Sequence, residues 1–332
     1  MRVWLPTIRA GTGADVYAKR LAAGLDQRGV EATITWLNHY YEIFPFLLKY
    51  RYGPENIDII HTNSVYGFAF RQPDVKLIVT VHHHNYDARN NLYKSVLQRI
   101  YHAHVLYHYE ARSFAVADRS IAVSKAASGH ISKAFSGVRP LVIHNGIDTD
   151  FFSPGPASGK SDKFKLLFVG KPSRGKGFDL LQPIMEKLGG GFFLYYTGHS
   201  NSRIQSLAQN TKNIGRLEPH ALLEMYRECD ALLFPSRCEG FGYAVCEAMA
   251  CGKPVIASDN SSLPELVRHN ETGLLCKTDA VDDFVAAARF LSANPERARR
   301  MGEAGREFVL EKFTLAKMTD NYIRLYEEVL SS

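Results

Sequence analysis

Residues 235–259 read P-S-R-C-E-G-F-G-Y-A-V-C-E-A-M-A-C-G-K-P-V-I-A-S-D. The apolar run A-L-L-F at 231–234 leads into this stretch and predicts a short buried strand. The G-F-G sequence at 240–242 permits a tight turn, and helix-forming residues follow at 243–251, with Gly252 placed to end the helix. The stretch therefore predicts a strand, a glycine turn and a helix N-terminus in succession. This arrangement presents backbone amides and a positive dipole end to a phosphate.

Two carboxylates flank this predicted phosphate site, Glu239 in the turn and Glu247 inside the helix. A carboxylate and a phosphate repel each other, so both side chains are better explained as acceptors for hydroxyl groups. Hydroxyl groups beside a phosphate are the chemistry of a nucleotide sugar. We therefore expect a ligand of this class.

The N-terminal half opens with a strand, a loop and a helix. Residues 1–7 have strand character, the loop R-A-G-T-G-A-D carries Gly11 and Gly13, and a helical pattern covers 16–28. This succession is the opening unit of a doubly wound parallel sheet. Val16 stands where the dinucleotide fingerprint has its third glycine, so a plain turn explains the loop about as well as a phosphate contact does.

Two later apolar runs, at 57–61 and 75–82, suit parallel strands that are buried on both faces. Each run ends in a histidine, at the carboxyl end where ligands of open α/β sheets bind. We therefore expect His82, His83 and His84 near a ligand site. No set of metal ligands converges on them in the sequence, so we predict no metal site.

The chain restarts the same pattern after a linker. Residues 149–162 are rich in proline, glycine and serine, and the strand pattern K-L-L-F-V-G follows at 165–170. The next loop, K-P-S-R-G-K-G at 171–177, places Lys171 and Lys176 where they can converge on one diphosphate. The D-x-D sequence just before the linker is interpreted as a turn and not as a metal site.

The length and composition of the chain indicate its class and its number of domains. The 332 residues predict two domains of about 150 residues each, and 45% hydrophobic with 22% charged residues is typical of a soluble globular protein. The net charge of +6 favours an anionic partner but leaves nucleotide, nucleic acid, lipid headgroup and no partner all open. We see no spanning segment or signal-peptide core, and the five cysteines form no C-x-x-C pair, so we expect a cytoplasmic protein with reduced thiols.

One surface motif has two interpretations. The run F-P-F-L-L-K-Y-R-Y at 44–52 and the segment 86–112 both mix aromatic residues with lysine and arginine. Such a surface suits peripheral contact with an anionic membrane. Ordinary packing of amphipathic tyrosines explains the same residues equally well.

Taken together, these motifs resemble the retaining glycosyltransferases of family four (group 1). The E-G-F-G-x-x-x-x-E pattern at 239–247, followed by A-M-A-C-G-K-P-V-I-A-S, is highly specific, and V-I-H-N-G-I-D-T-D-F-F-S-P at 142–154 also matches. The resemblance covers nearly the whole chain and implies the GT-B fold, in which two Rossmann-like doubly wound α/β domains face a cleft. It implies an acceptor-side domain at 1–155, a nucleotide-sugar domain at 156–312 and a helix at 313–332 that crosses back to the first domain.

The resemblance also assigns residues to the donor diphosphate. Lys171, where the family usually has arginine, and Lys176 would bind the diphosphate; lysine keeps the charge but loses the bidentate fork of arginine. The amide of Gly13 would approach the diphosphate from the other domain. The amides that would cap phosphate and sugar are those of Gly242, Tyr243 and Ala244.

The remaining assignments concern the sugar and the reaction. Glu247 would hydrogen-bond the ribose, Glu239 would contact the transferred sugar, and His82 would lie beside that sugar. The catalytic set is therefore Glu239, Lys176, Lys171 and His82, with no metal and no cofactor besides a UDP- or GDP-linked sugar as donor substrate.

The implied function is transfer of a hexosyl unit, with retention, to a hydroxyl acceptor in the assembly of lipopolysaccharide, capsule or another cell-envelope glycan. The acceptor would be a glycan or a lipid-linked molecule on the cytoplasmic face of the membrane. Two alternatives remain at this point: a nucleotide-sugar epimerase of the same fold and a non-catalytic nucleotide-sugar-binding protein. Nucleic-acid binding has no motif in its favour and is not expected.

Overall fold

Two separate parallel β-sheets, each with six strands among the residues described, form the framework of the protein. The structure is a computed structural model, and it describes residues 1–50, 53–83, 86, 92–156, 162–198 and 207–332, without the side chains of 49 and 50. His84 and linker residues 157–161 lie outside this range. The chain divides into two units, Met1–Gly146 with Leu315–Ser332, and Ile147–Thr314.

The sheet of the first unit has the strand order β2-β1-β3-β4-β5-β6, and all its pairs are parallel. The order changes direction between β1 and β3, which makes their carboxyl ends the topological switch point where ligands of such sheets bind. The strands are β1 (Arg2–Ile8), β2 (Glu31–Leu37), β3 (Ile59–Asn63), β4 (Lys76–Val81), β5 (Arg119–Ala122) and β6 (Leu141–Val142).

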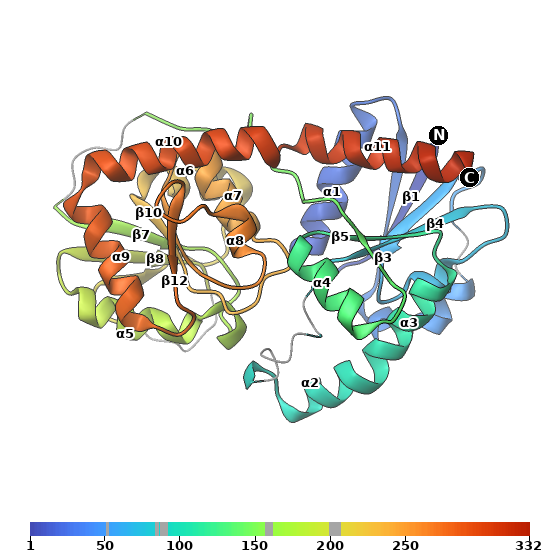
Figure 1. The fold of residues 1–332 in the computed structure, drawn as a ribbon, viewed down its shortest axis with the longest axis horizontal. Helices are drawn as coiled ribbons and strands as arrows, with labels where there is room; N and C mark the ends of the chain where they lie inside the picture. Colours follow the sequence, from blue (N-terminus) through green and yellow to red (C-terminus); the bar gives the residue numbers. More distant parts are fainter. Residues whose placement is uncertain (51–52, 84–85, 87–91, 157–161, 199–206) are drawn as a thin grey trace. The chain divides into compact units, whose positions relative to one another are not determined.

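Helices of the first unit come from both ends of the chain (Figure 1). C-terminal helix α11 (Leu315–Ser331) contacts α1 (Gly13–Asp26). Gly24 permits this contact, since a Cβ atom there would lie 2.1 Å from the hydroxyl oxygen of Thr319. The other helical segments are η1 (His39–Glu42), η2 (Pro45–Tyr50), η3 (Gly67–Phe70), α2 (Val96–Ile100), π-helical η5 (Tyr101–Leu106), α3 (Tyr107–Val116) and α4 (Lys125–Ala134).

The sheet of the second unit has the order β12-β11-β10-β7-β8-β9, again with parallel pairs throughout. When the strands are numbered from 1 to 6 starting at β7, their order is that of the Rossmann fold. The switch point of this sheet lies between β7 and β10. The strands are β7 (Phe164–Phe168), β8 (Phe192–Tyr196), β9 (Thr211–Asn213), β10 (Ala231–Phe234), β11 (Val255–Ser258) and β12 (Gly273–Cys276).

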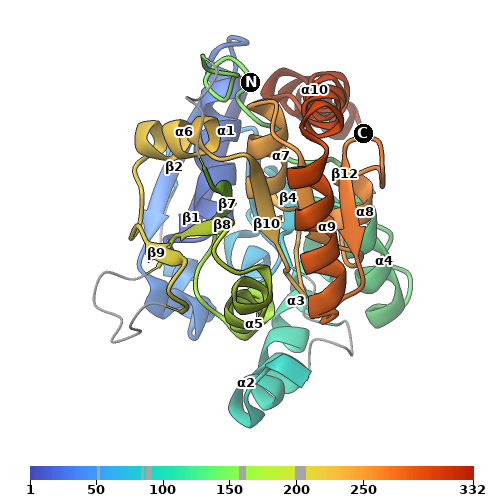
Figure 2. The same cartoon turned by 90° about the vertical axis from the view of Figure 1, so that its left-hand side faces the viewer.

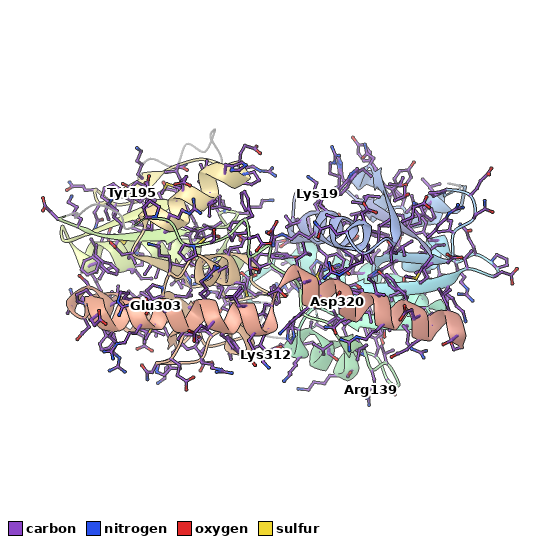
Figure 3. All side chains as sticks on the ribbon, turned by 90° about the horizontal axis from the view of Figure 1, so that it is seen from above. Lys19, Arg139, Tyr195, Glu303, Lys312 and Asp320 are labelled. Carbon is purple, nitrogen blue, oxygen red and sulfur yellow. The ribbon has the colours of Figure 1, made fainter. Side chains whose placement is uncertain are left out.

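Helices α5 (Phe178–Leu188) and α9 (Val281–Ala293) of the second unit contact each other (Figure 2). Helix α10 (Pro295–Lys312) packs closely, because Gly302 has no Cβ to strike the carbonyl of Gly252, and it leaves charged side chains such as Glu303 exposed (Figure 3). The unit also contains η6 (Arg174–Lys176), α6 (Pro219–Glu228), α7 (Tyr243–Ala250) and α8 (Leu263–Leu266).

The predicted fold class, two doubly wound parallel α/β sheets, is confirmed. The division between the units falls after Gly146, earlier than the predicted end at 155. The amide of Ile147 donates to the carbonyl of Phe313 at 2.8 Å, and Arg227 Nε donates to the carbonyl of Ser153 at 3.0 Å. These bonds attach residues 147–153 to the second unit. The sequence pattern could not reveal them, because their partners are distant in the chain.

Candidate functional site

The two loops that the sequence singled out in the second unit leave neighbouring strands of its sheet. Strand β10 pairs with β7 through Ala231 and Leu166, and these are the two strands of the switch point. The loop 171–177 follows β7, and the glycine turn at 239–242 follows β10. Topology therefore brings the predicted phosphate loop and the predicted phosphate-binding turn together.

An ion pair joins these loops. The Lys176 ammonium lies 2.6 Å from Oε1 and 2.7 Å from Oε2 of Glu239. Glu239 is buried, whereas the Lys176 side chain keeps 33% of its surface exposed. The lysine is therefore open to a further anion. Lys171 is exposed and makes no ion pair with any carboxylate that the structure describes.

Backbone geometry fixes the loop 171–177 against the end of β10. Gly177 has a φ of +67°, and a Cβ atom on it would lie 2.0 Å from the carbonyl oxygen of Pro235. The hydroxyl of Ser173 accepts a hydrogen bond from the Lys176 amide at 3.3 Å. A glycine is thus required at the point where the loop crosses the neighbouring strand.

Arg237 is the residue that ties the two loops together, and the sequence analysis missed it. Its buried guanidinium donates to both oxygens of Asp179, at 2.6 and 3.0 Å, to Asp279 at 2.5 Å, and to the Arg174 carbonyl. Its backbone amide donates to the carbonyl of Gly175 at 2.8 Å. An arginine within an otherwise small and apolar stretch was the available signal, because a buried cation needs partners.

The turn before α7 is held by Ser262, whose hydroxyl donates to the carbonyl of Phe241 at 2.6 Å and lies 3.1 Å from the carbonyl oxygen of Glu239. Gly242 has a φ of +113° and begins the helix. The earliest helical bond runs from the Val245 amide to the Gly242 carbonyl. The amides of Gly242, Tyr243 and Ala244 thus stand at the helix N-terminus, where the positive end of the dipole favours an anion.

Glu247 lies one turn into α7 and is buried. The hydroxyl of Tyr226, on α6, donates to its Oε2 at 3.1 Å. The carboxylate is thereby fixed in orientation.

In the first unit, Gly13 is the first residue of α1 and is exposed at the switch point between β1 and β3. The carboxylate of Asp15, in the first turn of α1, holds the preceding loop. It accepts hydrogen bonds from the amides of Ala10, at 3.2 Å, and Gly11, at 2.9 Å. The amide of Gly13 is not one of the two that donate to Asp15.

His82 follows β4 and packs its ring edge-on to Tyr17, with the ring centroids 4.5 Å apart. Burial, with a smaller contribution from His83, lowers the pKa of His82 to about 3. The imidazole is therefore neutral at neutral pH. It can donate and accept hydrogen bonds, but it cannot neutralise the charge of a diphosphate.

The structure corrects the predicted position of His61 in its strand. The sequence placed it at the carboxyl end of its strand, but β3 continues to Asn63 and His61 is buried inside the unit. Its Nδ1 lies 2.6 Å from the hydroxyl of Tyr326, and its Nε2 lies 2.7 Å from that of Thr80. Burial, with a smaller contribution from His82, lowers the pKa of His61 to about 3. The side chain joins β3, β4 and α11 inside the unit.

Glu110, on α3, is a buried carboxylate that the sequence analysis also missed. It accepts hydrogen bonds from Ser64 at 2.5 Å, His83 at 3.0 Å and Tyr86 at 2.5 Å. Burial alone would raise the pKa of Glu110, but His83 and the three hydrogen bonds outweigh it, and the net pKa is lowered. The carboxylate holds His83, and with it the start of the segment after β4, against α3.

Within the described residues, no group of three or more histidine, cysteine, aspartate or glutamate side chains is arranged to hold a metal ion. The same part of the chain contains no helix that is both long and apolar enough to cross a membrane.

Two family models match the chain. The model described as "Glycosyl transferases group 1" matches residues 155–308, and the model described as "Glycosyltransferase Family 4" matches residues 35–151. The chain belongs to the group 1 glycosyltransferases. The family predicted from the E-G-F-G-x-x-x-x-E pattern is therefore confirmed.

Several curated relatives share part of the sequence. Alpha-maltose-1-phosphate synthase of Mycolicibacterium smegmatis is 30% identical over 253 residues, which are 66% of this chain and 65% of the relative. D-inositol 3-phosphate glycosyltransferase of Segniliparus rotundus is 29% identical over 220 residues, 59% of this chain and 49% of that protein. The chain spans less than two thirds of the length of these relatives.

Solved structures share the fold over nearly the whole chain. Sucrose-phosphate synthase from Thermosynechococcus elongatus superposes with a TM-score of 0.83 at 20% identity, covering 99% of both chains. Anabaena Alr3699/HepE in complex with UDP and glucose gives a TM-score of 0.76 at 16% identity, covering 98% of this chain and 99% of that one. The two six-stranded sheets are those of the GT-B fold.

Proposed function

We propose that this group 1 glycosyltransferase moves a hexosyl unit from a nucleotide diphosphate sugar to a hydroxyl acceptor, with retention of the anomeric configuration. The observation that carries the proposal is the Lys176–Glu239 pair at the switch point between β7 and β10. One site there offers a partly exposed cation to a phosphate and a buried carboxylate to a sugar.

The cationic groups stabilise the leaving diphosphate. When the glycosidic bond breaks, negative charge accumulates on the diphosphate, and Lys176, Lys171 and the N-terminus of α7 can each oppose it. These groups perform the work that a divalent metal performs in other transferases. We therefore propose a metal-independent reaction.

The two carboxylates contact different parts of the donor. Glu247, oriented by Tyr226, accepts the ribose hydroxyls, and Glu239 orients the transferred sugar and stabilises the positive charge that develops on it. Attack and departure occur on the same face of the sugar, and the leaving phosphate takes the proton of the acceptor hydroxyl. The structural neighbour Alr3699/HepE, solved with UDP and with UDP-glucose, supports uridine as the base.

The acceptor that we propose is lipid-linked, in cell-envelope glycan assembly such as that of lipopolysaccharide or capsule. Its support is a set of exposed large apolar side chains on the first unit, with 65% of Tyr40 and 79% of Leu97 exposed. Tyr101 and Tyr109 tie the two segments together by donating to the carbonyls of Glu42, at 3.1 Å, and Ile43, at 3.0 Å. The exposed side chains are Tyr40, Ile43, Phe44, Phe46, Leu47, Leu92, Val96, Leu97 and Ile100.

An apolar surface of this kind suits peripheral contact with the headgroup region of a membrane. Flotation with liposomes that contain anionic lipid tests the contact. We expect the wild type to float and a Val96→Ser/Leu97→Ser variant to remain at the bottom. Leu330→Ser, at an exposed position on α11, is the control and should float like the wild type.

The transfer itself is tested by thermal unfolding and product analysis. A nucleoside diphosphate at one hundred times its Kd stabilises a folded protein by about 2.7 kcal/mol, so UDP or GDP should raise Tm visibly. With an acceptor-containing lipid extract, release of the diphosphate should depend on the extract, and NMR of the product should show the anomeric configuration of the donor.

Each alternative has its own outcome in these experiments. Formation of an epimer from the donor alone would assign the protein to the epimerases. Thermal stabilisation without turnover on any extract would make it a binding protein. Absence of stabilisation by both UDP and GDP would overturn the donor site itself.

A further inference from the structure

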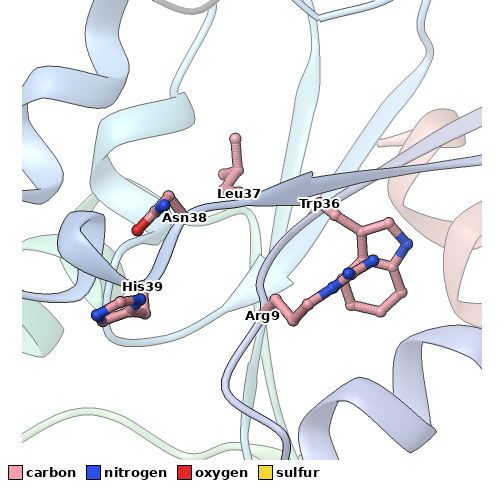
Figure 4. A pocket seen from close by; sticks show the side chains of 5 residues that line it. All are labelled: Arg9, Trp36, Leu37, Asn38 and His39. Carbon is pink, nitrogen blue, oxygen red and sulfur yellow. The ribbon is translucent and has the colours of Figure 1, made fainter.

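Two adjoining cavities lie in the first unit at the carboxyl ends of β1 and β2. The first, about 400 Å³, is lined by Arg9, Trp36, Leu37, Asn38 and His39 (Figure 4). The second, about 540 Å³, shares Trp36, Leu37 and Asn38 with it. Its further lining residues are Tyr40, Tyr41, Phe44 and Leu47. Each cavity falls within the range of small-ligand sites, and the shared residues make them one bipartite space.

The first cavity is cationic. The Arg9 guanidinium carbon lies 5.1 Å from the centroid of the Trp36 ring, and the Lys19 ammonium, on α1 (Figure 3), lies 5.9 Å from it. Both side chains are exposed, and neither forms an ion pair with a carboxylate in the described part of the chain. Asp15, the nearest acidic residue along the chain, is engaged by the amides of Ala10 and Gly11. Arg9, which lines the cavity, and Lys19, beside the same Trp36 ring, are therefore two cations available to an anion bound there.

The second cavity is aromatic and apolar. Tyr40, Phe44 and Leu47 each keep about half or more of their surface exposed beside it, with values of 65%, 49% and 47%. Exposed apolar side chains that gather around a cavity are typical of a binding site for apolar groups. The same three residues belong to the surface that we assign to membrane contact.

The place of the cavities in the fold agrees with a substrate site. The last paired residues of β1 and β2 are Ile8 and Leu37, and Arg9 directly follows Ile8. The switch point of this sheet lies beside them, between β1 and β3. Substrates of open α/β sheets bind at this edge.

We propose that the two cavities form the acceptor site, and that the acceptor is an amphiphile with a phosphate-bearing, hydroxylated headgroup and an apolar chain. The headgroup lies in the first cavity against Arg9 and Lys19, and the chain runs along Tyr40, Phe44 and Leu47 toward the membrane. This inference rests on the glycosyl transfer proposed above, because it names the acceptor of that reaction.

Trp36 supplies a direct readout. The chain has two tryptophans, and Trp4 is 1% exposed, so a ligand in the cavities would act on the emission of Trp36. The probe is dodecyl phosphate below its critical micelle concentration, added to the full chain. We expect a saturable change in emission that is lost in Trp36→Phe.

Variants separate the two halves of the site. Arg9→Gln/Lys19→Gln should raise the apparent Kd for dodecyl phosphate about tenfold or more, because two charge-assisted contacts are lost. Tyr40→Ser/Phe44→Ser should weaken binding to a similar degree. Lys133→Gln, an exposed lysine on α4, should leave the Kd unchanged.

Three results would overturn the proposal. The first is no saturable response to dodecyl phosphate. The second is an equal response to inorganic phosphate, which would indicate a free-anion site without a lipid part. The third is an equal response to dodecyl maltoside, unaffected by Arg9→Gln/Lys19→Gln, which would indicate an apolar patch without headgroup recognition.

Failure of the proposed transfer would look different. Thermal stabilisation by UDP or GDP reports on the donor site in the second unit and should be the same in the wild type and in Arg9→Gln/Lys19→Gln. Its absence in the wild type would count against the donor site, whereas the Trp36 titration reports on the acceptor site alone.

Discussion

The ammonium of Lys176 lies within hydrogen-bonding distance of both carboxylate oxygens of Glu239, although 63 residues separate the two in the chain. The pair connects the loop after β7 to the turn after β10. Because the carboxylate is buried, the lysine supplies the positive charge that makes its burial tolerable. A diphosphate bound as we propose would compete for the same lysine, and donor binding would then be coupled to this ion pair.

Loss of either partner should abolish most of the turnover. We expect Lys176→Ala and Glu239→Gln each to reduce kcat by about 10²-fold or more, since each removes a group that acts on charge developing in the transition state. The measurement is release of nucleoside diphosphate at saturating donor.

Lys187→Ala is the matched control for these variants. Lys187 forms an exposed pair with Asp282 at 2.6 Å in the same unit and should leave turnover unchanged. Near-wild-type kcat in both Lys176→Ala and Glu239→Gln would contradict their roles.

Arg237 should be a positioning residue for the donor loops. Arg237→Lys keeps the charge but cannot reach Asp179, Asp279 and the Arg174 carbonyl together. Removing one partner of a fully buried pair costs about 3–5 kcal/mol; the aspartates here are 39% and 44% exposed, so we expect a loss of about 2 kcal/mol in unfolding free energy. Urea unfolding measures this loss.

The functional signature is a rise in the KM for the donor that exceeds the fall in kcat, because the loops lose their alignment while Lys176 and Glu239 remain. Arg299→Lys, on the exposed face of α10, is the control and should leave both the unfolding free energy and the KM unchanged, because its ion pairs are exposed to solvent. A stability loss in Arg237→Lys with an unchanged KM would mean that the residue is structural only.

Local patterns made one half of the candidate site predictable. The glycine turn, the helix N-terminus and the lysine loop each occupy fewer than about ten consecutive residues, and their chemistry follows from residue type and order. Parallel-strand patterns then predicted the sheets that bring them together.

The partners of buried charges were not predictable. Arg237 bonds with Asp179 and Asp279, which lie 58 and 42 residues away, and Glu110 bonds with Ser64, 46 residues away. No local period encodes such pairs. His61 shows the related difficulty of strand ends, since β3 continues for two residues beyond the predicted end and His61 makes a buried bond to Tyr326.

His61 should make stability fall as the pH falls. Its pKa is 6.5 in a model peptide and about 3 in the folded protein, so below pH 6.5 the unfolded chain binds a proton that the folded chain does not. The stability contributed by the neutral ring is complete above pH 6.5 and is lost toward pH 3, at about 1.4 kcal/mol per pH unit.

Urea unfolding between pH 7.5 and pH 5 tests this dependence. His61→Gln loses the bonds to Tyr326 and Thr80 and should be about 1–3 kcal/mol less stable at pH 7.5. Its stability should nevertheless fall less steeply below pH 6.5 than that of the wild type, by about 1.4 kcal/mol per pH unit. His82 is present in both proteins, so its own titration contributes to both slopes. Parallel pH profiles would show that His61 is charged in the folded state.

The contact between α1 and α11 should depend on Gly24. A Cβ atom there would lie 2.1 Å from the hydroxyl oxygen of Thr319, so Gly24→Ala must push the helices apart, and overpacking of this kind costs about 1–3 kcal/mol. Gly129→Ala on α4 is the matched control, because nothing lies within 4 Å of its added Cβ. Alanine there should be neutral or stabilising by about 0.5–1 kcal/mol. A second change, Thr319→Ala, removes the obstructing hydroxyl and should restore part of the stability lost in Gly24→Ala. If the two changes are additive instead, the loss in Gly24→Ala does not come from this contact.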